Sequence, residues 1–149
     1  MALDTLKANR PLVLYGGLAG LVPFFISALG LQLGWLAVEA FMQYSVIILS
    51  FLSGALWWHG LKAETEESGS HRPHETTLPL ALALPAAAWL VLFLPDRVTV
   101  LLLGGGYLAL WVWEMLFMRD IYRKRYLLLR TVLTVLVLVL HFWVLTLVA

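Results

Sequence analysis

Side chains able to bind a polar ligand or carry a proton lie inside long apolar stretches of this sequence. Glu39 is followed by no other charged residue until Lys62. In a helix with about 100° per residue, several polar or small residues share a face with this carboxylate: Gln43, Ser50, Ser53, Gly54 and Trp57. Polar groups facing lipid are costly, so we expect this stripe to face neighbouring helices or a water-filled cavity. Two interpretations stay open, close helix packing through the small residues or a pocket for a ligand or proton path.

Two later stretches also gather polar and aromatic residues on one helical face. The first face holds Tyr107, Trp111, Glu114 and Met118, and the second holds Arg130, Thr134 and His141. Glu114 and Arg130 flank a short basic turn at similar depth, so we predict that they form a structural ion pair. Together with the stripe after Glu39, these faces predict an intramembrane pocket between the second, fourth and fifth helices.

His141 lies near the middle of the last apolar stretch. An imidazole, with an unperturbed pKa near 6.5, is the natural proton carrier inside a membrane. Its expected partners are Glu39 and Ser50. The alternative is that the histidine is a packing residue held by hydrogen bonds.

Several kinds of chemistry are excluded or disfavoured by the residues present. Cysteine is absent, so neither a disulfide nor a thiolate nucleophile can form. The sequence has no Gly-rich phosphate loop after a strand and no H-E-x-x-H motif. His59 and His141 would lie about 20 Å apart along the membrane normal, too far to share one haem iron. We expect no catalytic residues, no metal ion, no cofactor and no nucleic-acid partner.

Composition indicates which elements must position these side chains. Hydrophobic residues make up 62% of the chain and charged residues 13%, against roughly 45–50% and 25% in soluble domains. A span requires about 20 mostly apolar residues, and only helices or closed barrels satisfy the backbone in lipid. Residues 1–149 therefore predict a single all-α transmembrane domain, a bundle of five helices at about 11–33, 34–58, 78–94, 98–118 and 127–149.

The distribution of basic residues predicts the orientation of the bundle. With five spans, one side receives Lys7, Arg10, Lys62, Arg72, Arg119, Arg123, Lys124, Arg125 and Arg130, and the other side receives only Arg97. The positive-inside rule then places the N-terminus in the cytoplasm and the C-terminus in the periplasm.

Glycine, proline and a polar segment mark the predicted packing sites and breaks. Gly16, Gly20 and Gly54 are expected to let helices approach closely, and Pro23 to kink the first helix. The segment LGLQLG, which ends at Gly34, predicts a tight turn between the first two helices. Residues 62–77 contain four glutamates and no apolar periodicity, and they predict a mobile cytoplasmic loop.

Three stretches carry a resemblance to a known family. They are YGGLAGLVPFF (Tyr15–Phe25), YSVIILSFLSGALWW (Tyr44–Trp58) and YLLLRTVLT (Tyr126–Thr134). In this order and spacing the sequence resembles the transmembrane protein 69 family over nearly its whole length, and departs from it in the longer acidic 62–77 loop. The resemblance implies a small polytopic protein of the bacterial or mitochondrial inner membrane. It implies no activity and no catalytic residue.

These observations favour a non-enzymatic protein of the bacterial inner membrane. It would bind membrane lipids, a small hydrophobic ligand or a larger membrane complex, as an accessory subunit or assembly factor. The alternative is a small proton-coupled transporter or carrier that uses Glu39 and His141. A third class, an enzyme acting on a lipid or a quinone, has the least support because the sequence shows no nucleophile–base pair.

Overall fold

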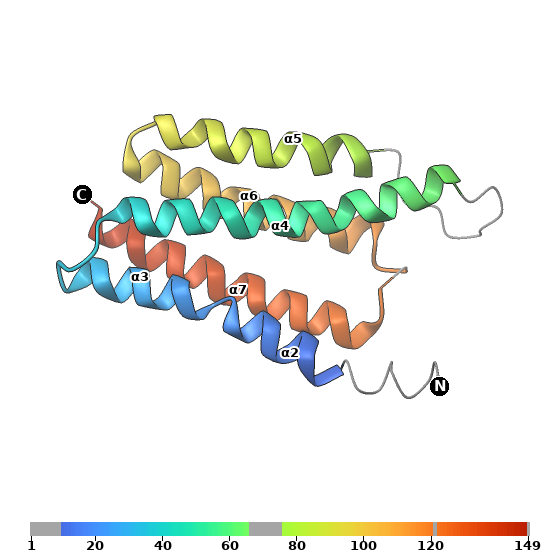
Figure 1. Cartoon of the computed structure of the whole chain (residues 1–149), viewed down its shortest axis with the longest axis horizontal. Coiled ribbons are helices and arrows are strands. Elements are labelled where there is room, and N and C mark those ends of the chain that lie inside the picture. Colours follow the sequence, from blue (N-terminus) through green and yellow to red (C-terminus); the bar gives the residue numbers. More distant parts are fainter. Residues whose placement is uncertain (1–9, 66–75, 121, 149) are drawn as a thin grey trace.

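The chain folds into helices that run alternately up and down the molecule. The computed structural model describes residues 10–65, 76–120 and 122–148, and it contains no strand within them. The elements are α2 (Arg10–Ala19), α3 (Val22–Gln32), α4 (Val38–Thr65), α5 (Thr77–Leu90), the 3-10 helix η1 (Val91–Phe93), α6 (Asp96–Phe117) and α7 (Lys124–Leu147). Figure 1 shows that the combined segment α2–α3 and then α4, α5, α6 and α7 follow one another in alternating directions. The predicted all-helical class is confirmed.

Four of these segments are long and apolar enough to cross a membrane: Leu14–Gln32, Val38–His59, Asp96–Phe117 and Lys124–Leu147. The fifth, Thr77–Phe93, is shorter. At 1.5 Å per residue it would rise about 25 Å, slightly less than the roughly 30 Å of a hydrocarbon core. Pro85 lies inside α5, and η1 ends this segment before Pro95.

The first predicted helix is broken into α2 and α3 at Gly20 and Leu21. Pro23 lies in the first turn of α3, where it has no N–H to continue the hydrogen-bond ladder. The hydroxyl of Tyr44 on α4 donates a hydrogen bond to the carbonyl oxygen of Gly20, at 2.9 Å. The chain therefore bends where the sequence predicts a kink, and a side chain of α4 satisfies part of the backbone at the bend.

The turn between α3 and α4 begins at the end of the predicted LGLQLG segment, at residue 33, and extends to residue 37. Gly34 has a φ of 73°, which is accessible to glycine without strain. A Cβ atom on Gly30 would lie 2.7 Å from Leu36 Cδ1, so the turn folds tightly over this residue. The backbone N–H of Trp35 donates to the Gly30 carbonyl at 2.8 Å.

Helix α4 differs from its predicted bounds at both ends. It begins at Val38 rather than at residue 34, because the turn after α3 occupies the intervening residues, and it ends at Thr65 rather than at residue 58. Residues 62–65, predicted as part of the mobile loop, continue the helix through good helix formers such as Ala63 and Glu64. The remainder of that predicted loop, residues 66–75, lies outside the described residues.

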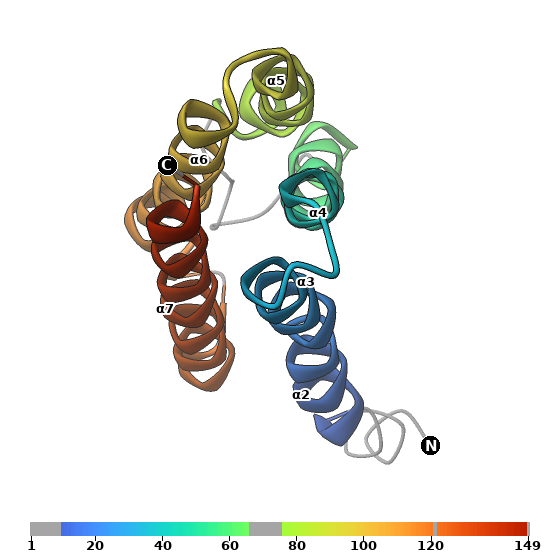
Figure 2. The ribbon, with the colours of Figure 1, turned by 90° about the vertical axis from the view of Figure 1, so that its left-hand side faces the viewer.

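The core lies where α3, α4, α6 and α7 meet. Figure 2 shows α3 beside α4, with α7 facing α2 and α3 from the other side and α5 at the far edge, next to α4 and α6. Phe24 of α3, Phe41 and Leu49 of α4, and Tyr107 of α6 are almost completely buried. Large apolar side chains on the outer faces are exposed, as is normal for helices in lipid.

Candidate functional site

Helix α7, the last helix, has a row of buried polar side chains on the face that points into the bundle. Arg130, Thr134 and His141 are all buried, together with Val137 and Val144. Their spacing of three or four residues keeps them on one side of a helix. The structure thus places the three predicted polar residues on one inward face, whose two ends have different surroundings.

In the N-terminal part of α7, Arg130 Nε donates a hydrogen bond to Glu114 Oε2 of α6 at 2.7 Å. The two side chains are only 5% and 4% exposed. These are the residues for which the sequence predicts an ion pair. The two charges offset each other within the bundle, and removal of either one would leave the other buried without compensation.

Two polar atoms beside this ion pair are buried and have no hydrogen-bond partner within the described part of the chain, Arg130 Nη2 and Thr134 Oγ1. Buried donors and acceptors are normally paired, because a polar group without a partner in an apolar environment costs free energy. Arg130 and Thr134 are one helical turn apart on α7, so their side chains lie next to each other. These two atoms are therefore the exceptions to hydrogen-bond pairing that need an explanation.

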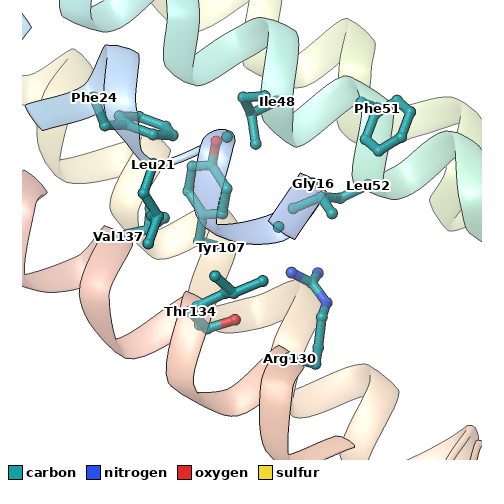
Figure 3. A pocket seen from close by; sticks show the side chains of 13 residues that line it. Gly16, Leu21, Phe24, Ile48, Phe51, Leu52, Tyr107, Arg130, Thr134 and Val137 are labelled. Carbon is teal, nitrogen blue, oxygen red and sulfur yellow. The ribbon is translucent and has the colours of Figure 1, made fainter. Parts of the chain in front are cut away.

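The space next to these atoms is a pocket of about 520 Å³, a volume that includes its open mouth. Its lining residues are Gly16, Gly17, Gly20, Leu21, Phe24, Ile48, Phe51, Leu52, Tyr107, Arg130, Leu133, Thr134 and Val137. Figure 3 shows the Arg130 side chain extending from α7 toward Gly16 and Leu52. The walls are almost entirely apolar, with a few polar groups, as is typical of small-molecule sites.

The pocket reaches the outer surface of the bundle between α2 and α4. Phe51, one of its lining residues, is 72% exposed, and Gly16 on the α2 side is exposed as well. Tyr107 and Thr134 at the inner end are buried. The pocket therefore runs from the outer surface of the bundle to the unpaired polar atoms of α7.

His141 belongs to a tightly packed cluster that shares Phe24 and Tyr107 with the wall of the pocket. Its Nδ1 donates to the carbonyl oxygen of Val137 at 2.8 Å, and its Nε2 lies 2.9 Å from Ser45 Oγ of α4. Because a carbonyl can only accept, Nδ1 carries the proton, and in the neutral ring Ser45 then donates to Nε2. The ring centroid of Phe41 lies 4.9 Å from that of the imidazole.

Two further rings close this cluster around the imidazole. The ring centroids of Tyr107 and Phe24 lie 5.4 Å and 5.8 Å from that of His141. The Tyr107 hydroxyl donates to the backbone carbonyl of Ser45 at 2.8 Å, which joins α6 to α4. A Cβ on Gly104 would be 3.5 Å from His141 Cβ, so α6 and α7 approach closely here. Both imidazole nitrogens have partners, and His141 is not among the residues that line the pocket.

Aromatic side chains cluster near the Glu114–Arg130 pair at the end of the bundle. The ring centroids of Tyr122 and Tyr126 are 4.8 Å apart, and those of Tyr122 and His59 are 5.4 Å apart. Tyr122 lies between α6 and α7, and burial raises the pKa of its phenol above the usual value. It therefore stays protonated at physiological pH and adds no charge next to the ion pair.

The predicted stripe on α4 is only partly directed inward. Ser53 is fully buried and Ser50 is half-buried. The rest of the stripe is exposed: Glu39, Gln43, Gly54 and Trp57. The buried face is instead formed by Val38, Phe41, Met42, Ser45, Leu49, Ser53 and Leu56. This face is rotated by about one residue, or ~100°, from the centre of the predicted stripe.

The rotation has a physical explanation. Glu39 and Gln43 lie in the first two turns of α4, and Trp57 lies close to the end of its apolar part at His59. At both places side chains can extend to the polar interface. Helix packing in lipid depends on close van der Waals contact rather than on the burial of polar groups. The apolar face with Ser45 and Ser53 therefore packs inward, and the polar ends of the helix remain outside.

Of the remaining predicted residues, some line the pocket and others lie outside it. Trp111 is half-buried and its Nε1 donates to Thr131 Oγ1 at 3.0 Å, which links α6 to α7 outside the pocket. Gly16 and Gly20 line the pocket. A Cβ on Gly54 would have nothing within 4 Å, so this glycine makes no close helix contact within the described part of the chain. The close contact of α2 is made by Gly17, where a Cβ would lie 2.8 Å from Leu133 Cδ1.

Sequence reasoning did not identify Ser45, Phe24 or Gly17, nor the other apolar residues that line the pocket. Ser45 is a single hydroxyl in an apolar run, and its role depends on the rotation of α4. A signal was present, because apolar residues at positions 38, 41, 42, 49 and 56 have helical spacing and Ser45 falls on their face. Nothing in the sequence indicates how close Gly17 lies to α7.

The pocket and the Ser45–His141 contact are distinct features of the structure. Ser45 and His141 are in contact as a nucleophile and a base would be, but neither lines the pocket. Among the described residues, no group of three or more acidic or histidine side chains could hold a metal ion. The pocket offers an apolar surface and two hydrogen-bonding groups at its inner end.

A family model described as a protein of unknown function (DUF3429) matches residues 9–146. No curated protein and no solved structure matches the chain. The family match covers nearly all of the helices described above and both the pocket and the His141 cluster. The chain belongs to this family of proteins of unknown function, DUF3429.

Proposed function

We propose that this protein is a non-enzymatic, multi-pass membrane protein that binds a small hydrophobic molecule from the bilayer. The observation that carries the proposal is the presence of two buried, unpartnered polar atoms in the described part of the chain, Arg130 Nη2 and Thr134 Oγ1, next to an apolar pocket. A bound molecule would satisfy these atoms and fill the pocket between α2, α3, α4, α6 and α7. The wall formed by α2 and α3 extends the pocket expected from the sequence between α4, α6 and α7.

The proposal places the chain in the bacterial inner membrane with five passes and a cytoplasmic N-terminus. The five antiparallel segments put the basic turn from Arg119 to Arg125 and residue Arg97 at opposite ends of the bundle. This distribution follows the positive-inside rule. The short segment of α5 and η1 runs along α4 (Figure 1), so we include it as the fifth pass. The resemblance to the transmembrane protein 69 family supports the same location.

The ligand-binding role is favoured over the two alternatives by the position of His141. A proton-coupled carrier requires a path between Glu39 and His141, but α4 turns Phe41 and Ser45 toward the imidazole, and Glu39 is exposed. An enzyme would require the Ser45–His141 contact to face a substrate. A role as an accessory subunit or assembly factor that presents a bound lipid to a larger complex remains part of the proposal.

Binding can be tested with a pair of glycine substitutions. Gly16 and Gly54 are both helical and exposed, and a Cβ on either would meet nothing within 4 Å, but only Gly16 lines the pocket. We expect Gly16→Phe to place a ring at the pocket and to weaken binding of a lipid-soluble, environment-sensitive naphthalene probe at least tenfold. Gly54→Phe is the matched control and should bind the probe as the wild type does.

The measurement is probe fluorescence during titration of the purified protein in nanodiscs. A second variant, Ile48→Trp, places a larger side chain on a different wall of the same pocket. It distinguishes a blocked pocket from a folding defect caused by the substitution at Gly16. If both pocket variants bind the probe as well as Gly54→Phe does, the pocket is not a ligand site and the proposal is wrong.

A further inference from the structure

We infer that the molecule in this pocket is uncharged and carries an oxygen that accepts hydrogen bonds, attached to an apolar body. The inference rests on the proposed function and names the ligand class. It follows from three properties of the pocket: the two groups without partners, the charge already present beside them, and the position of the opening.

The hydrogen-bonding groups at the inner end are donors. The guanidinium of Arg130 can only donate, and the hydroxyl of Thr134 can donate or accept. Both atoms are buried and unpartnered among the described residues, and the two residues are one turn apart on α7. A carbonyl oxygen has two lone pairs, so one such oxygen between the two residues can accept from both. A ligand that offered only donors would leave Arg130 Nη2 unsatisfied.

The charge balance favours a neutral acceptor over an anion. The positive charge of Arg130 is offset by Glu114, whose Oε2 lies 2.7 Å from Arg130 Nε. A carboxylate or phosphate entering the pocket would add a second negative charge to a buried pair that is already balanced. Burial of an uncompensated charge is far more costly than burial of a carbonyl group. A neutral oxygen gains the hydrogen bonds without this penalty.

The shape of the pocket favours a ligand with an apolar body that enters from the bilayer. Phe51 and Gly16 lie at the exposed side of the pocket, between α2 and α4, and the walls between them and Thr134 are apolar. The polar end of the ligand would thus lie deep in the bundle and its apolar end toward the acyl chains. Two membrane molecules share this chemistry, a quinone ring with an alkyl tail and the acyl ester of a glycerolipid.

The inference can be tested by competition against the naphthalene probe in nanodiscs. The competitors are a decyl-substituted benzoquinone, a short-chain diacylglycerol, decanoate, and decylbenzene, which resembles the quinone but has no oxygen. We expect the quinone, the diacylglycerol or both to displace the probe at concentrations at least tenfold lower than decylbenzene or decanoate. Whichever of the two displaces the probe at the lower concentration shows whether the acceptor oxygen belongs to a quinone or to a glycerolipid ester.

The variant Thr134→Val keeps the shape of the side chain and removes the hydroxyl. It should weaken binding of the preferred acceptor ligand roughly five- to tenfold and leave decylbenzene unchanged, because only the former uses the hydrogen bond. Ser50→Ala, which removes a hydroxyl on α4 outside the pocket, is the control and should change neither.

The possible results separate this inference from the proposed function. If decylbenzene competes as well as the oxygen-containing ligands, or if decanoate binds most tightly, the inference is wrong, and the pocket remains a hydrophobic site that Gly16→Phe blocks. If no competitor displaces the probe and Gly16→Phe has no effect, the proposed function itself is wrong.

Discussion

The inward face of α7 carries buried polar side chains at both ends, but their hydrogen bonds are complete at one end and incomplete at the other. Around His141, both ring nitrogens are hydrogen-bonded and three aromatic rings from α3, α4 and α6 fill the surrounding space. Around Thr134 and Arg130, a polar atom of each residue has no partner in the described part of the chain, and a pocket lies beside them. A buried polar residue is therefore a guide to function only when its hydrogen bonds are counted.

The comparison also corrects the most obvious expectation from residue types. A histidine in a membrane helix suggests proton transfer, whereas a threonine suggests only packing. In this structure the histidine is the better satisfied of the two and holds α7 to α4 through Ser45. The threonine lies at the open site. Three substitutions would break or sharpen the contrast.

The largest effect is expected at the ion pair that bounds the open end. Glu114→Ala would leave the guanidinium of Arg130 buried without its carboxylate, and we expect a loss of about 3–5 kcal/mol in the free energy of unfolding. Thermal unfolding in detergent, followed by circular dichroism, would measure it. The double variant Glu114→Ala/Arg130→Met removes both charges and should recover a large part of the loss. An unchanged melting temperature for Glu114→Ala would show that the pair contributes no stability.

A smaller effect is expected at the closed end. Ser45→Ala removes the hydroxyl that bonds to His141 Nε2 and leaves a buried nitrogen without a partner. We expect a loss of about 1 kcal/mol, as found for hydrogen bonds between membrane helices. The same unfolding measurement applies, with Ser50→Ala as a matched serine at a half-buried position. Equal stability of the two variants would contradict a structural role for the Ser45–His141 contact.

The smallest effect on stability is expected for Thr134→Val. The hydroxyl of Thr134 has no partner among the residues that the structure describes, so its removal should change the free energy of unfolding by less than about 0.5 kcal/mol or stabilise the protein slightly. This result would contrast with Ser45→Ala, although both remove one buried hydroxyl. A loss as large as that of Ser45→Ala would mean that Thr134 is already satisfied within the protein.

The sequence predicts the fold better than the site. Apolar length indicates the helices, and the turn at Gly30–Gly34 and the kink near Pro23 follow from local backbone chemistry. The faces of α6 and α7 are also predicted, because Glu114, Arg130 and His141 lie too deep for all of them to be directed outward. These inferences depend on properties of single helices.

Helix α4 shows why the remainder could not be predicted. Its polar residues are concentrated near its ends, where they can reach the interface, so the stripe containing Glu39 and Trp57 indicates the wrong direction for the helix. The true orientation depends on how α4 fits against α3, α5 and α6, which no single-helix pattern contains. The pocket is harder still to predict, because it depends on the relative positions of several helices. It lies where Gly16, Leu52 and Thr134, which belong to three different helices, leave space between them.

The bend at Gly20 and Leu21 gives the first membrane segment two directions instead of one. Its second half, α3, packs against α4 and α7 in the core, while its first half, α2, forms the outer side of the pocket. The hydroxyl of Tyr44 bonds to the backbone at the junction. The direction of α2 relative to α3, and with it the width of the pocket entrance, is therefore set at a junction to which a phenol of the neighbouring helix is bonded.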